Sequence, residues 1–486
     1  MNTPKIILVL FQISCLCLAM TLKNNEVVVK ADSSTIKVPD DYPTIHEALN
    51  KAGSGDTIFV RKGIYAENIV INKSLTLIGE NRESTIIDGG ARGNVISVKA
   101  PNVTISGFTV RNSDPSMGCG ILIELFGNIV ISNNNIRNNK IGIRISSSSR
   151  NQICGNIISA NYIGIQLFSS SDNAIYRNVI FDNAVGINAY YYSIGNIFYE
   201  NVINTNNWGV LLFSDSDNNV FYHNNFIDNF YNVYAEQTAN IWCYNCEGNY
   251  WDDYKGEDLD KNGIGDTPYI IAERNMDYYP LMGRYYTFDV HFKEEDYRIS
   301  IVSNSTISNF AFKVAAEFRA RIILFNASIA NSSGGFSRVI IPKGLMENVH
   351  AVFVNENEVN ATLTNAADTK NHYLYIEYSG NCSIKIVYLE LLDLYHQLLD
   401  KIRSLNDTNN ILIDKINTLN ETLHDLLTNW SDFQKLFFNI NTSYQVQEQN
   451  LKNLAYIFAL AIAIFIMVTI YLSKVANTKQ SRIVES

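Results

Sequence analysis

Asparagine recurs at a fixed interval through the middle of the chain, and this repeat constrains the fold more than any other feature. The first column contains Asn128, Asn151, Asn173, Asn196, Asn219 and Asn240. A second column follows five residues later, at Asn133, Asn156, Asn178, Asn201, Asn224 and Asn245. A third lies at Asn138, Asn161, Asn183, Asn206 and Asn229, and glycine has the same period at Gly120, Gly142, Gly164, Gly186 and Gly209. Such self-similarity predicts a stack of repeated units.

The segments between the columns alternate apolar and polar residues over short runs, such as IGIQL at 163–167 and WGVLL at 208–212. A period of about 22 residues built from such runs fits one coil of a parallel β-helix. Equivalent residues would then lie about 4.8 Å apart, so asparagine side chains can hydrogen-bond along a column and tolerate left-handed turns. We interpret the columns as structural, with ligand binding as the alternative. A leucine-rich repeat does not match them, because it has one Asn per unit.

Both ends of the repeat carry segments typical of caps. A short amphipathic helix is predicted from Pro43 and Thr44 through Ala52, and TIFV at 57–60 is expected to start the first strands. A closing segment consists of GNYWDDYKGEDLDKNGIGDTPYII at 248–271 and MDYYPLM at 276–282. It is similar to segments that end many archaeal surface β-helix proteins. Caps and repeats together resemble the NosD-like right-handed parallel β-helix family over residues 35–283, a branch of the carbohydrate-binding and sugar-hydrolysing β-helices.

Two activities of related proteins are not expected here. NosD is linked to copper-site maturation, but the β-helix offers only His46 and His223 and few Met residues. GIYAEN at 63–68 resembles the opening of pectin methylesterases, whose later Gln, Asp and Arg signatures are missing. The resemblance therefore implies a fold and leaves the chemistry open.

The region after the β-helix changes pattern twice. Residues 284–388 contain alternating runs such as FDVHF and RIILF without the Asn columns, which predicts a β-sandwich. From Leu391 to Tyr444 apolar residues recur at steps of four and three, which predicts a coiled coil at 389–452. Asn409 is the lone polar residue at an a position, a pattern that favours a parallel homodimer. A trimer, or a single helix lying on the sandwich, remains an alternative.

The two ends of the chain indicate export and membrane attachment. Residues 1–20 have the layout of a secretory signal peptide, with Lys5 before an apolar run. Residues 454–472 carry no charge and are long enough to form a transmembrane helix. The tail at 473–486 is basic before Glu485, as expected of a cytoplasmic flank. We therefore expect a single-pass protein of the cell membrane with a large extracellular region.

Charge and cysteine content exclude several classes of protein. The net charge is −10, and no Lys/Arg block precedes the extreme C-terminus, so we expect no nucleic-acid partner. Without the signal peptide, five scattered cysteines remain, which do not form a disulfide scaffold. Cys243 and Cys246 form a CxxC, interpreted as structural thiols or a local disulfide; a metal half-site and a redox pair are the alternatives. No organic cofactor is expected.

A sugar hydrolase or lyase would need paired carboxylates, or a carboxylate with a basic residue, on one face. Asp182 and Asp228 share a repeat position two coils apart, hence about 10 Å, slightly wide for an inverting pair. Arg177, Glu200 and His223 occupy one column on consecutive coils. These five residues are weak catalytic candidates, because a surface ladder explains the column equally well.

Aromatic residues form two further columns, one at Phe168, Tyr190 and Phe213 and one at Tyr176, Tyr199 and Tyr222. Exposed ladders of rings suit sugar binding, whereas inward-facing ladders would only stack in the core. In the closing segment, Asp258, Asp260, Asn262 and Asp266 have the D-x-D-x-N-G-x-x-D spacing of a calcium loop, similar to thrombospondin type 3 repeats. The alternative to calcium is an Asp/Gly turn held by its own hydrogen bonds.

Nine of the eleven N-x-S/T glycosylation sequons follow residue 283, at Asn304, Asn326, Asn331, Asn360, Asn381, Asn406, Asn420, Asn429 and Asn441. Only Asn72 and Asn102 fall in the β-helix, so its lateral face is expected to stay bare. The sequence thus favours a membrane-anchored surface protein whose β-helix binds glycans or envelope proteins without catalysis. The alternative is a cell-attached polysaccharide lyase or glycoside hydrolase.

Overall fold

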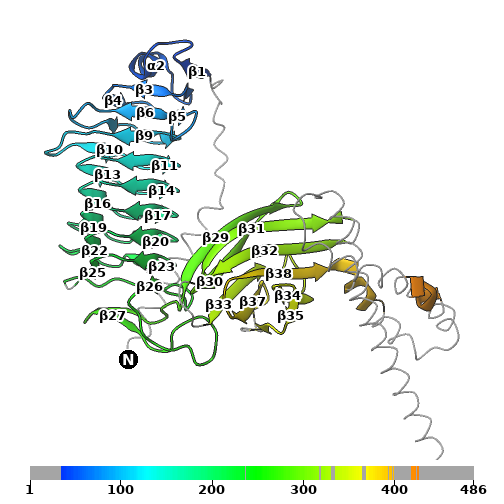
Figure 1. The fold of residues 1–486 in the computed structure, drawn as a ribbon. Coiled ribbons are helices and arrows are strands. Elements are labelled where there is room, and N and C mark those ends of the chain that lie inside the picture. The colour runs from blue at the N-terminus through cyan, green and yellow to red at the C-terminus, as the bar shows by residue number, and fades with distance from the viewer. Residues whose placement is uncertain are drawn as a thin grey trace, which may run out of the picture. The chain divides into compact units, whose positions relative to one another are not determined.

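The computed structural model describes residues 34–391 except 236, 317–318, 330–333 and 364–367, together with 393–396, 398, 418–422 and 424–425. Contacts divide the chain into two compact units, one ending at Asn173 and one beginning at Ala174. Both units are mainly β and contain coils of three short parallel strands, stacked so that every third strand pairs (Figure 1). The predicted parallel β-helix is confirmed in each unit.

The first unit begins with a cap around the helix α2 (Ile45–Lys51). The Thr44 side chain accepts the Glu47 N–H at 3.1 Å, which satisfies one of the free donors at the helix start. The predicted helix is therefore confirmed. The expected first strand is wrong: β1 (Thr35–Val38) precedes the helix and pairs in parallel with β2 (Thr57–Val60).

Three parallel sheets run through the coils of the first unit. Its first sheet contains β1, β2, β5 (Thr76–Gly79), β8 (Thr104–Ser106), β11 (Val130–Ser132) and β14 (Gln152–Cys154). Its second sheet contains β3 (Gly63–Tyr65), β6 (Thr85–Asp88), β9 (Thr109–Arg111), β12 (Asn135–Arg137) and β15 (Ile157–Ser159). Its third sheet contains β4 (Ile69–Ile71), β7 (Ile96–Val98), β10 (Cys119–Glu124), β13 (Ile141–Ser146) and β16 (Ile163–Phe168).

The second unit starts with coils of the same kind. Its first sheet contains β17 (Ala174–Tyr176), β20 (Ile197–Tyr199) and β23 (Val220–Tyr222). Its second contains β18 (Val179–Phe181), β21 (Val202–Asn204), β24 (Asn225–Ile227) and β26 (Tyr250–Trp251), and its third contains β19 (Val185–Tyr190), β22 (Trp208–Leu212) and β25 (Tyr231–Tyr234). A hairpin of β27 (Tyr269–Ala272) and β28 (Asn275–Asp277) follows.

In most three-residue strands of the first and second sheets the central residue points into the coil, where Ile131 and Ile136 in the first unit and Phe198 and Phe221 in the second are 0% exposed. Burying each such side chain contributes about 1.5–3 kcal/mol. In the second unit the core becomes aromatic, because Phe198 stacks on Phe221 and Phe221 on Trp242, each pair with ring centroids 4.4 Å apart.

The asparagine columns are hydrogen-bond ladders within the turns. In the second unit, the backbone N–H and side-chain Nδ2 of Asn178 both donate to Oδ1 of Asn201, at 3.0 Å each. Asn201 donates in the same way to Asn224, and Asn224 to Asn249. Each buried amide thereby satisfies backbone and side-chain groups of neighbouring coils. The structural interpretation of the columns is confirmed.

Four predicted column members are wrong. Asn134 and Asn139 form the ladders, in place of Asn133 and Asn138, and Asn249 takes the place of Asn245. Asn128 is also not part of its ladder, because the backbone N–H that donates to Oδ1 of Asn151 belongs to Ile129. All four misassigned residues have positive φ, between 50° and 60°. For Asn128, Asn133 and Asn138 the left-handed position lies just before the ladder residue, and asparagine tolerates the left-handed position as well as the ladder position, so the sequence alone does not separate them. Asn245 lies four residues before Asn249, in the closing turn where the repeat is lost.

The hairpin of β27 and β28 ends two of these columns. Asn240 donates its N–H to Oδ1 of Asn275 at 3.0 Å, and Asn249 donates its N–H to Oδ2 of Asp277 at 2.7 Å. Both end residues are 0% exposed. The closing segment therefore replaces the next coil and leaves no buried amide without a partner at the ends of these two columns.

The remainder of the second unit, here the two-sheet region, consists of two five-stranded antiparallel sheets. One contains β29 (Arg284–Phe292), β30 (Glu295–Ser303), β33 (Gly335–Pro342), β37 (Asn371–Tyr378) and β36 (Thr362–Leu363). The other contains β31 (Thr306–Ala315), β32 (Ala320–Ser328), β38 (Cys382–Leu389), β34 (Ala351–Val354) and β35 (Asn357–Val359). Buried side chains of both sheets, such as Ile301 and Ile386, form one cluster.

Several predicted segments lie outside the described residues: the signal peptide at 1–20, the transmembrane helix at 454–472, the tail at 473–486 and most of the coiled coil at 389–452. Among the residues that the structure does describe, no helix has the length and apolarity required to span a bilayer.

Candidate functional site

The charged column occupies the left-handed turn position of successive coils, since Arg177, Glu200 and His223 each have a φ of 55°. Each residue directly precedes a ladder asparagine of the second column. The structure brings all three against the two-sheet region of the same unit.

Arg177 and Glu200 form a four-membered ion network with the hairpin of β29 and β30. Arg177 binds Oε2 of Glu200 at 2.6 Å and Oδ2 of Asp289 at 2.7 Å. Arg298 closes the ring, lying 3.3 Å from Oε1 of Glu200 and 3.1 Å from Oδ1 of Asp289. Hydrogen bonds from Arg177, followed by those from Arg298, lower the pKa of Asp289.

His223 belongs to a second, more buried cluster. Its Nε2 lies 2.7 Å from Oε2 of Glu247, and its ring stacks on Tyr285 with centroids 3.9 Å apart. Arg338, with its side chain only 3% exposed, binds the other oxygen of Glu247. Burial alone would raise the pKa of Glu247, but the charge of Arg338 and the hydrogen bond from His223 outweigh it and lower the pKa to about 2.

Both clusters join the coils to the two-sheet region. Asn225 adds a backbone connection, because its Oδ1 accepts the Tyr285 N–H at 2.7 Å and its Nδ2 donates to the Tyr285 carbonyl at 2.9 Å. Arg177 and Glu200 thus have partners of opposite charge, and His223 is hydrogen-bonded to Glu247. This arrangement stabilises a junction and offers no unpaired acid or base for catalysis.

The carboxylate pair is arranged differently. Asp182 and Asp228 occupy equivalent left-handed positions, with φ of 54° and 51°, and both are exposed. Asp228 lines a pocket, which Asp182 does not. The structure therefore does not bring these two carboxylates together at one cavity.

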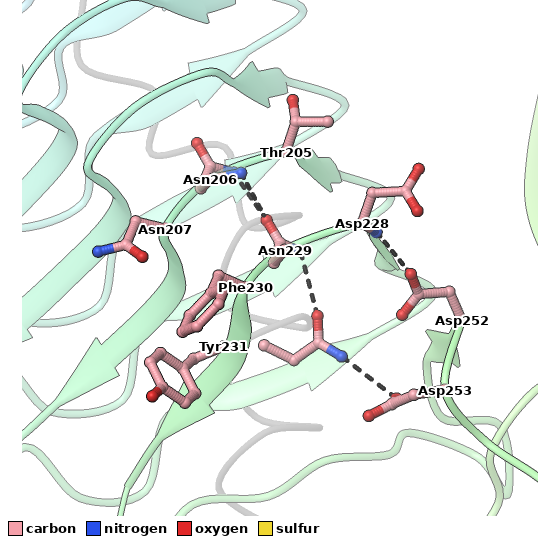
Figure 2. Close-up of a pocket in the computed structure, with 10 residues that line it drawn as sticks. Thr205, Asn206, Asn207, Asp228, Asn229, Phe230, Tyr231, Asp252 and Asp253 are labelled. Atoms are coloured by element: carbon pink, nitrogen blue, oxygen red, sulfur yellow. Dashed lines mark hydrogen bonds between the residues drawn. The ribbon is translucent and has the colours of Figure 1, made fainter.

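The pocket lies at the last coils of the second unit and has a volume of 820 Å³. Figure 2 shows Phe230 and Tyr231 on one side of a chain of amides and Asp252 and Asp253 on the other. The chain links the third asparagine column to the closing segment, since Asn206 donates to Asn229, Asn229 to Asn232, and Asn232 to Asp253 (Figure 2).

Both aromatic columns form ladders. Tyr176 stacks on Tyr199 and Tyr199 on Tyr222, with centroids 4.8 and 5.3 Å apart and planes within 7°. Tyr190 stacks on Phe213 at 5.5 Å. Phe168 lies in the first unit, where the Arg144 guanidinium lies 5.7 Å from its ring centroid. Ile175, Phe198 and Phe221, which directly precede the three stacked tyrosines, are buried in the core. Because side chains alternate along a strand, the tyrosines face outward, and they are half-buried.

A polar row missed by sequence reasoning lies two residues after the glycine column. Arg144 and Gln166 are register partners in the first unit, and Asn188 has the same place in the second. Nε of Arg144, Oε1 of Gln166 and Oδ1 of Asn188 are buried without hydrogen-bond partners. The available signal was a polar residue after the Gly-Ile pair of three successive coils, at an outward position beside the aromatic column.

Among the pocket residues, Phe230, Tyr231, Asp252 and Asp253 were also missed. Trp208 supports Tyr231 from outside the lining. Trp208 and Tyr231 occupy the position before the glycine column, one coil apart, and their rings stack at 4.2 Å. Earlier coils have Ile or Val at this position. The change to aromatic residues was the sequence signal that could have indicated the pocket. Asp252 and Asp253 belong to the closing segment. The repeat ends there, so the sequence pattern gave no indication that these two residues line a pocket.

In the acidic loop the carboxylates bind the loop backbone. Asp258 accepts the N–H groups of Asn262 at 2.9 Å and Gly263 at 2.8 Å, and Asp266 accepts that of Leu259 at 2.7 Å. Asp260 accepts from the Asn262 side chain at 2.7 Å. Burial, with neighbouring Asp260, raises the pKa of Asp258. These bonds match the Asx turn, and the described residues contain no group of three or more His, Cys, Asp or Glu placed to hold a metal.

The CxxC lies in a tight turn, in which Tyr244 and Glu247 exchange backbone hydrogen bonds at 2.8 and 3.0 Å. Cys243 and Cys246 are not joined by a disulfide. Burial raises the pKa of the Cys243 thiol to about 11, so this residue is not an activated nucleophile.

Four predicted glycosylation sites, Asn331, Asn406, Asn429 and Asn441, lie outside the described residues. The acceptors Asn304, Asn360, Asn381 and Asn420 are exposed, whereas Asn326 is half-buried on β32. Attachment at Asn326 would therefore compete with packing along that strand.

Comparison with known proteins gives one family match. The family model of NosD, described as a periplasmic copper-binding protein, matches residues 49–256. A cell surface glycoprotein of Methanothermus fervidus is 33% identical over 111 residues, covering 22% of this chain and 18% of that glycoprotein. The chain thus matches less than a fifth of the length of this relative.

Two of the solved structures with detectable similarity show how low the sequence identity and the TM-scores are. An alginate lyase from Paenibacillus sp. FPU-7 is 11% identical over 45% of this chain and 97% of its own, with a TM-score of 0.32. A DFA-IIIase from Arthrobacter chlorophenolicus A6 is 14% identical over 44% of this chain and 76% of its own, with a TM-score of 0.35. At these values neither likeness supports an activity.

The residues of the matched segment do not fit a copper site. Copper would need a cluster of His, Met or Cys ligands. His223 is bound to Glu247 and stacked on Tyr285, Met117 is an exposed single side chain, and Cys119 is buried alone in the strand β10. Cys243 and Cys246 are free thiols that belong to no group of three or more His, Cys, Asp or Glu residues that could hold a metal among the described residues.

Proposed function

Because residues 49–256 form a NosD-like β-helix, we propose that the protein is a membrane-anchored surface protein whose β-helix binds glycans without turning them over. The single observation that carries the proposal is the stacked Tyr190–Phe213 pair, half-buried on the outer face of the third sheet. Rings about 5 Å apart match the apolar faces of sugars laid along the stack.

The polar row beside these rings supports the same function. Asn188 is adjacent to Tyr190 in the alternation of β19, and its Oδ1 is buried without a partner. An unsatisfied polar atom costs about 1–3 kcal/mol. A sugar hydroxyl reaching it after a small side-chain movement would recover part of that cost.

Surface location is supported by the sequence and by the relative. The M. fervidus protein carries the name cell surface glycoprotein. The predicted signal peptide, coiled-coil homodimer, transmembrane helix and β-sandwich at 284–388 complete the proposal of an extracellular head on a stalk. Exposed sequons at Asn304, Asn360 and Asn381 are consistent with a glycosylated region beside the membrane.

The alternative, a lyase or hydrolase, lacks a supporting arrangement, because Arg177 and Glu200 are bound in ion pairs and His223 is hydrogen-bonded to Glu247. An envelope protein in place of a glycan remains the other ligand class. Calcium at Asp258, Asp260, Asn262 and Asp266 is a separate proposal, tested by calorimetric titration of wild type and Asp260→Ala. Heat of binding in wild type alone supports it, and no heat in wild type removes it.

The test of glycan binding is an array probed with the detergent-solubilised full chain. Wild type should bind a defined set of glycans, and the Tyr190→Ala/Phe213→Ala variant should lose them. Tyr162→Ala is the matched control, since Tyr162 is an exposed aromatic residue outside both ladders. Equal binding by wild type and the ladder variant would remove the proposal, and release of sugar products would favour the enzyme.

A further inference from the structure

The pocket of the last coils has its own chemistry, and we infer that it binds a sugar that carries a free, positively charged amino group. The inference goes beyond the proposed function, because neither Tyr190 nor Phe213 lines this pocket. Its volume of 820 Å³ falls within the range of about 300–1,000 Å³ typical of small-ligand sites.

The aromatic side of the pocket is open to a ligand. Phe230 is 73% exposed and Tyr231 is 48% exposed, so both rings are accessible to a ligand. Tyr231 is held in place by stacking on Trp208 at 4.2 Å, and Phe230 packs edge-on against Tyr231 at 4.6 Å. A rigid pair of exposed rings provides both a stacking surface for a pyranose and a cation–π partner for an ammonium group.

The opposite side is acidic and preorganised (Figure 2). Asp253 is fixed at both oxygens, because Oδ1 accepts from Asn232 at 3.2 Å and Oδ2 from the Tyr269 hydroxyl at 3.1 Å. Asp252 accepts the backbone N–H of Asp228 at 2.5 Å through Oδ2. These carboxylates therefore keep their positions before a ligand arrives, which lowers the ordering cost of binding.

The charges of the residues that line the pocket favour one class of sugar. Among the residues that line the pocket, three are aspartates and none is Lys, Arg or His. Uronic acids and sulfated sugars would be repelled, and neutral sugars would leave the carboxylates without a positive partner. An ammonium group would gain charge-assisted hydrogen bonds to the carboxylates while its ring lies on Phe230 and Tyr231.

The pocket also lies where the coil pattern ends. The first two asparagine columns end on buried residues of β28, but the third passes through Asn229 and Asn232 to Asp253 at the surface. The polar groups that continue this column are therefore presented to solvent. This placement explains why the pocket occurs at this coil and depends on the closing segment.

The experiment is calorimetric titration of the detergent-solubilised full chain with tetra-glucosamine and with its fully N-acetylated counterpart. The two probes differ only at the amino groups, which are free and charged in one and acetylated and neutral in the other. Wild type should bind the free amine about tenfold more tightly, since a charge-assisted hydrogen bond is worth about that factor. Asp252→Asn/Asp253→Asn should abolish the difference, and Phe230→Ala should weaken binding of both probes.

Matched controls keep the test specific. Asparagine keeps one acceptor oxygen at each position, so at position 253 one of the two hydrogen bonds, from Asn232 or from Tyr269, is lost. Thermal unfolding of the double variant is therefore measured beside binding, and a melting temperature close to that of wild type shows that the loop is retained. Asp182→Asn removes an exposed carboxylate from the same turn position outside the pocket and should leave the preference unchanged. Equal affinity of wild type for the two probes, or a preference that persists in the double variant, would overturn the inference. In that case the proposed function would still stand if the Tyr190→Ala/Phe213→Ala variant loses glycan binding on the array.

Discussion

Asp277 accepts the backbone N–H of Asn249 at 2.7 Å and its side-chain Nδ2 at 3.3 Å, so a carboxylate ends a column otherwise built of amides. The indole of Trp251 donates to the same oxygen at 2.9 Å. Burial outweighs these donors and raises the pKa of Asp277 to about 6. The last position of the column is therefore sensitive to pH, whereas its asparagines are not.

The first prediction concerns this pH dependence. A carboxyl whose pKa rises from 3.8 unfolded to about 6 folded binds more protons when folded, so stability should fall as pH rises between these values. The loss should be about 3 kcal/mol. Urea unfolding followed by tryptophan fluorescence at pH 4 to 7 should show this slope in wild type and a flatter profile in Asp277→Asn. Parallel profiles would show that Asp277 does not titrate in this range.

The second prediction has the opposite sign. The pKa of Glu247 is lowered from 4.5 to about 2, so its contribution is present above pH 4.5 and lost as pH falls through about 2. Glu247→Gln leaves the buried Arg338 without its partner and should cost about 3–5 kcal/mol at neutral pH. Urea unfolding measures this, with Glu257→Gln at an exposed position as control. A change of under 1 kcal/mol would show that the junction does not depend on this pair.

The third prediction tests the ladder. Asn201→Ala removes the acceptor of the Asn178 N–H and the donor to the Ile175 carbonyl, leaving buried groups unpaired. Each costs about 1–3 kcal/mol, so the variant should lose several kcal/mol in urea unfolding. The exposed Asn207 is the control, and Asn207→Ala should change stability by less than about 0.5 kcal/mol. Similar losses in the two variants would argue against a special role for the column.

The fourth prediction concerns the glycine column. A Cβ at Gly142 would lie 2.5 Å from the carbonyl oxygen of Gly164 in the neighbouring coil. Only a movement of the backbone could lengthen this distance. Gly142→Ala should therefore lower the melting temperature through about 1–3 kcal/mol of strain. Gly53→Ala is the control, because its Cβ would approach only the Asp56 carboxylate, at 3.5 Å. Equal melting temperatures for Gly142→Ala and wild type would mean that the coils can separate to admit a methyl group.

The sequence predicts those parts of the fold that depend on neighbouring coils. The period, the tyrosine column and most ladder residues follow from spacing alone, because each contact joins residues about one repeat apart. The outward direction of the tyrosines did not follow from spacing and was left open. The partners of the charged column could not be found in this way. Asp289 and Arg338 lie on antiparallel strands with no fixed offset from Arg177 or Glu247. The pocket was missed for the same reason, because Asp253 belongs to the aperiodic closing segment.

The most direct test of the account is the affinity of the full chain for a glycan selected on the array, measured by calorimetry for wild type and for Phe213→Ala. Loss of one ring of a stacked pair should weaken binding about tenfold, since such a contact is worth about 1–3 kcal/mol. Thermal unfolding should be nearly unchanged, because Phe213 is half-buried at the surface. An unchanged affinity for Phe213→Ala would contradict the claim that the aromatic ladder of the β-helix binds glycans.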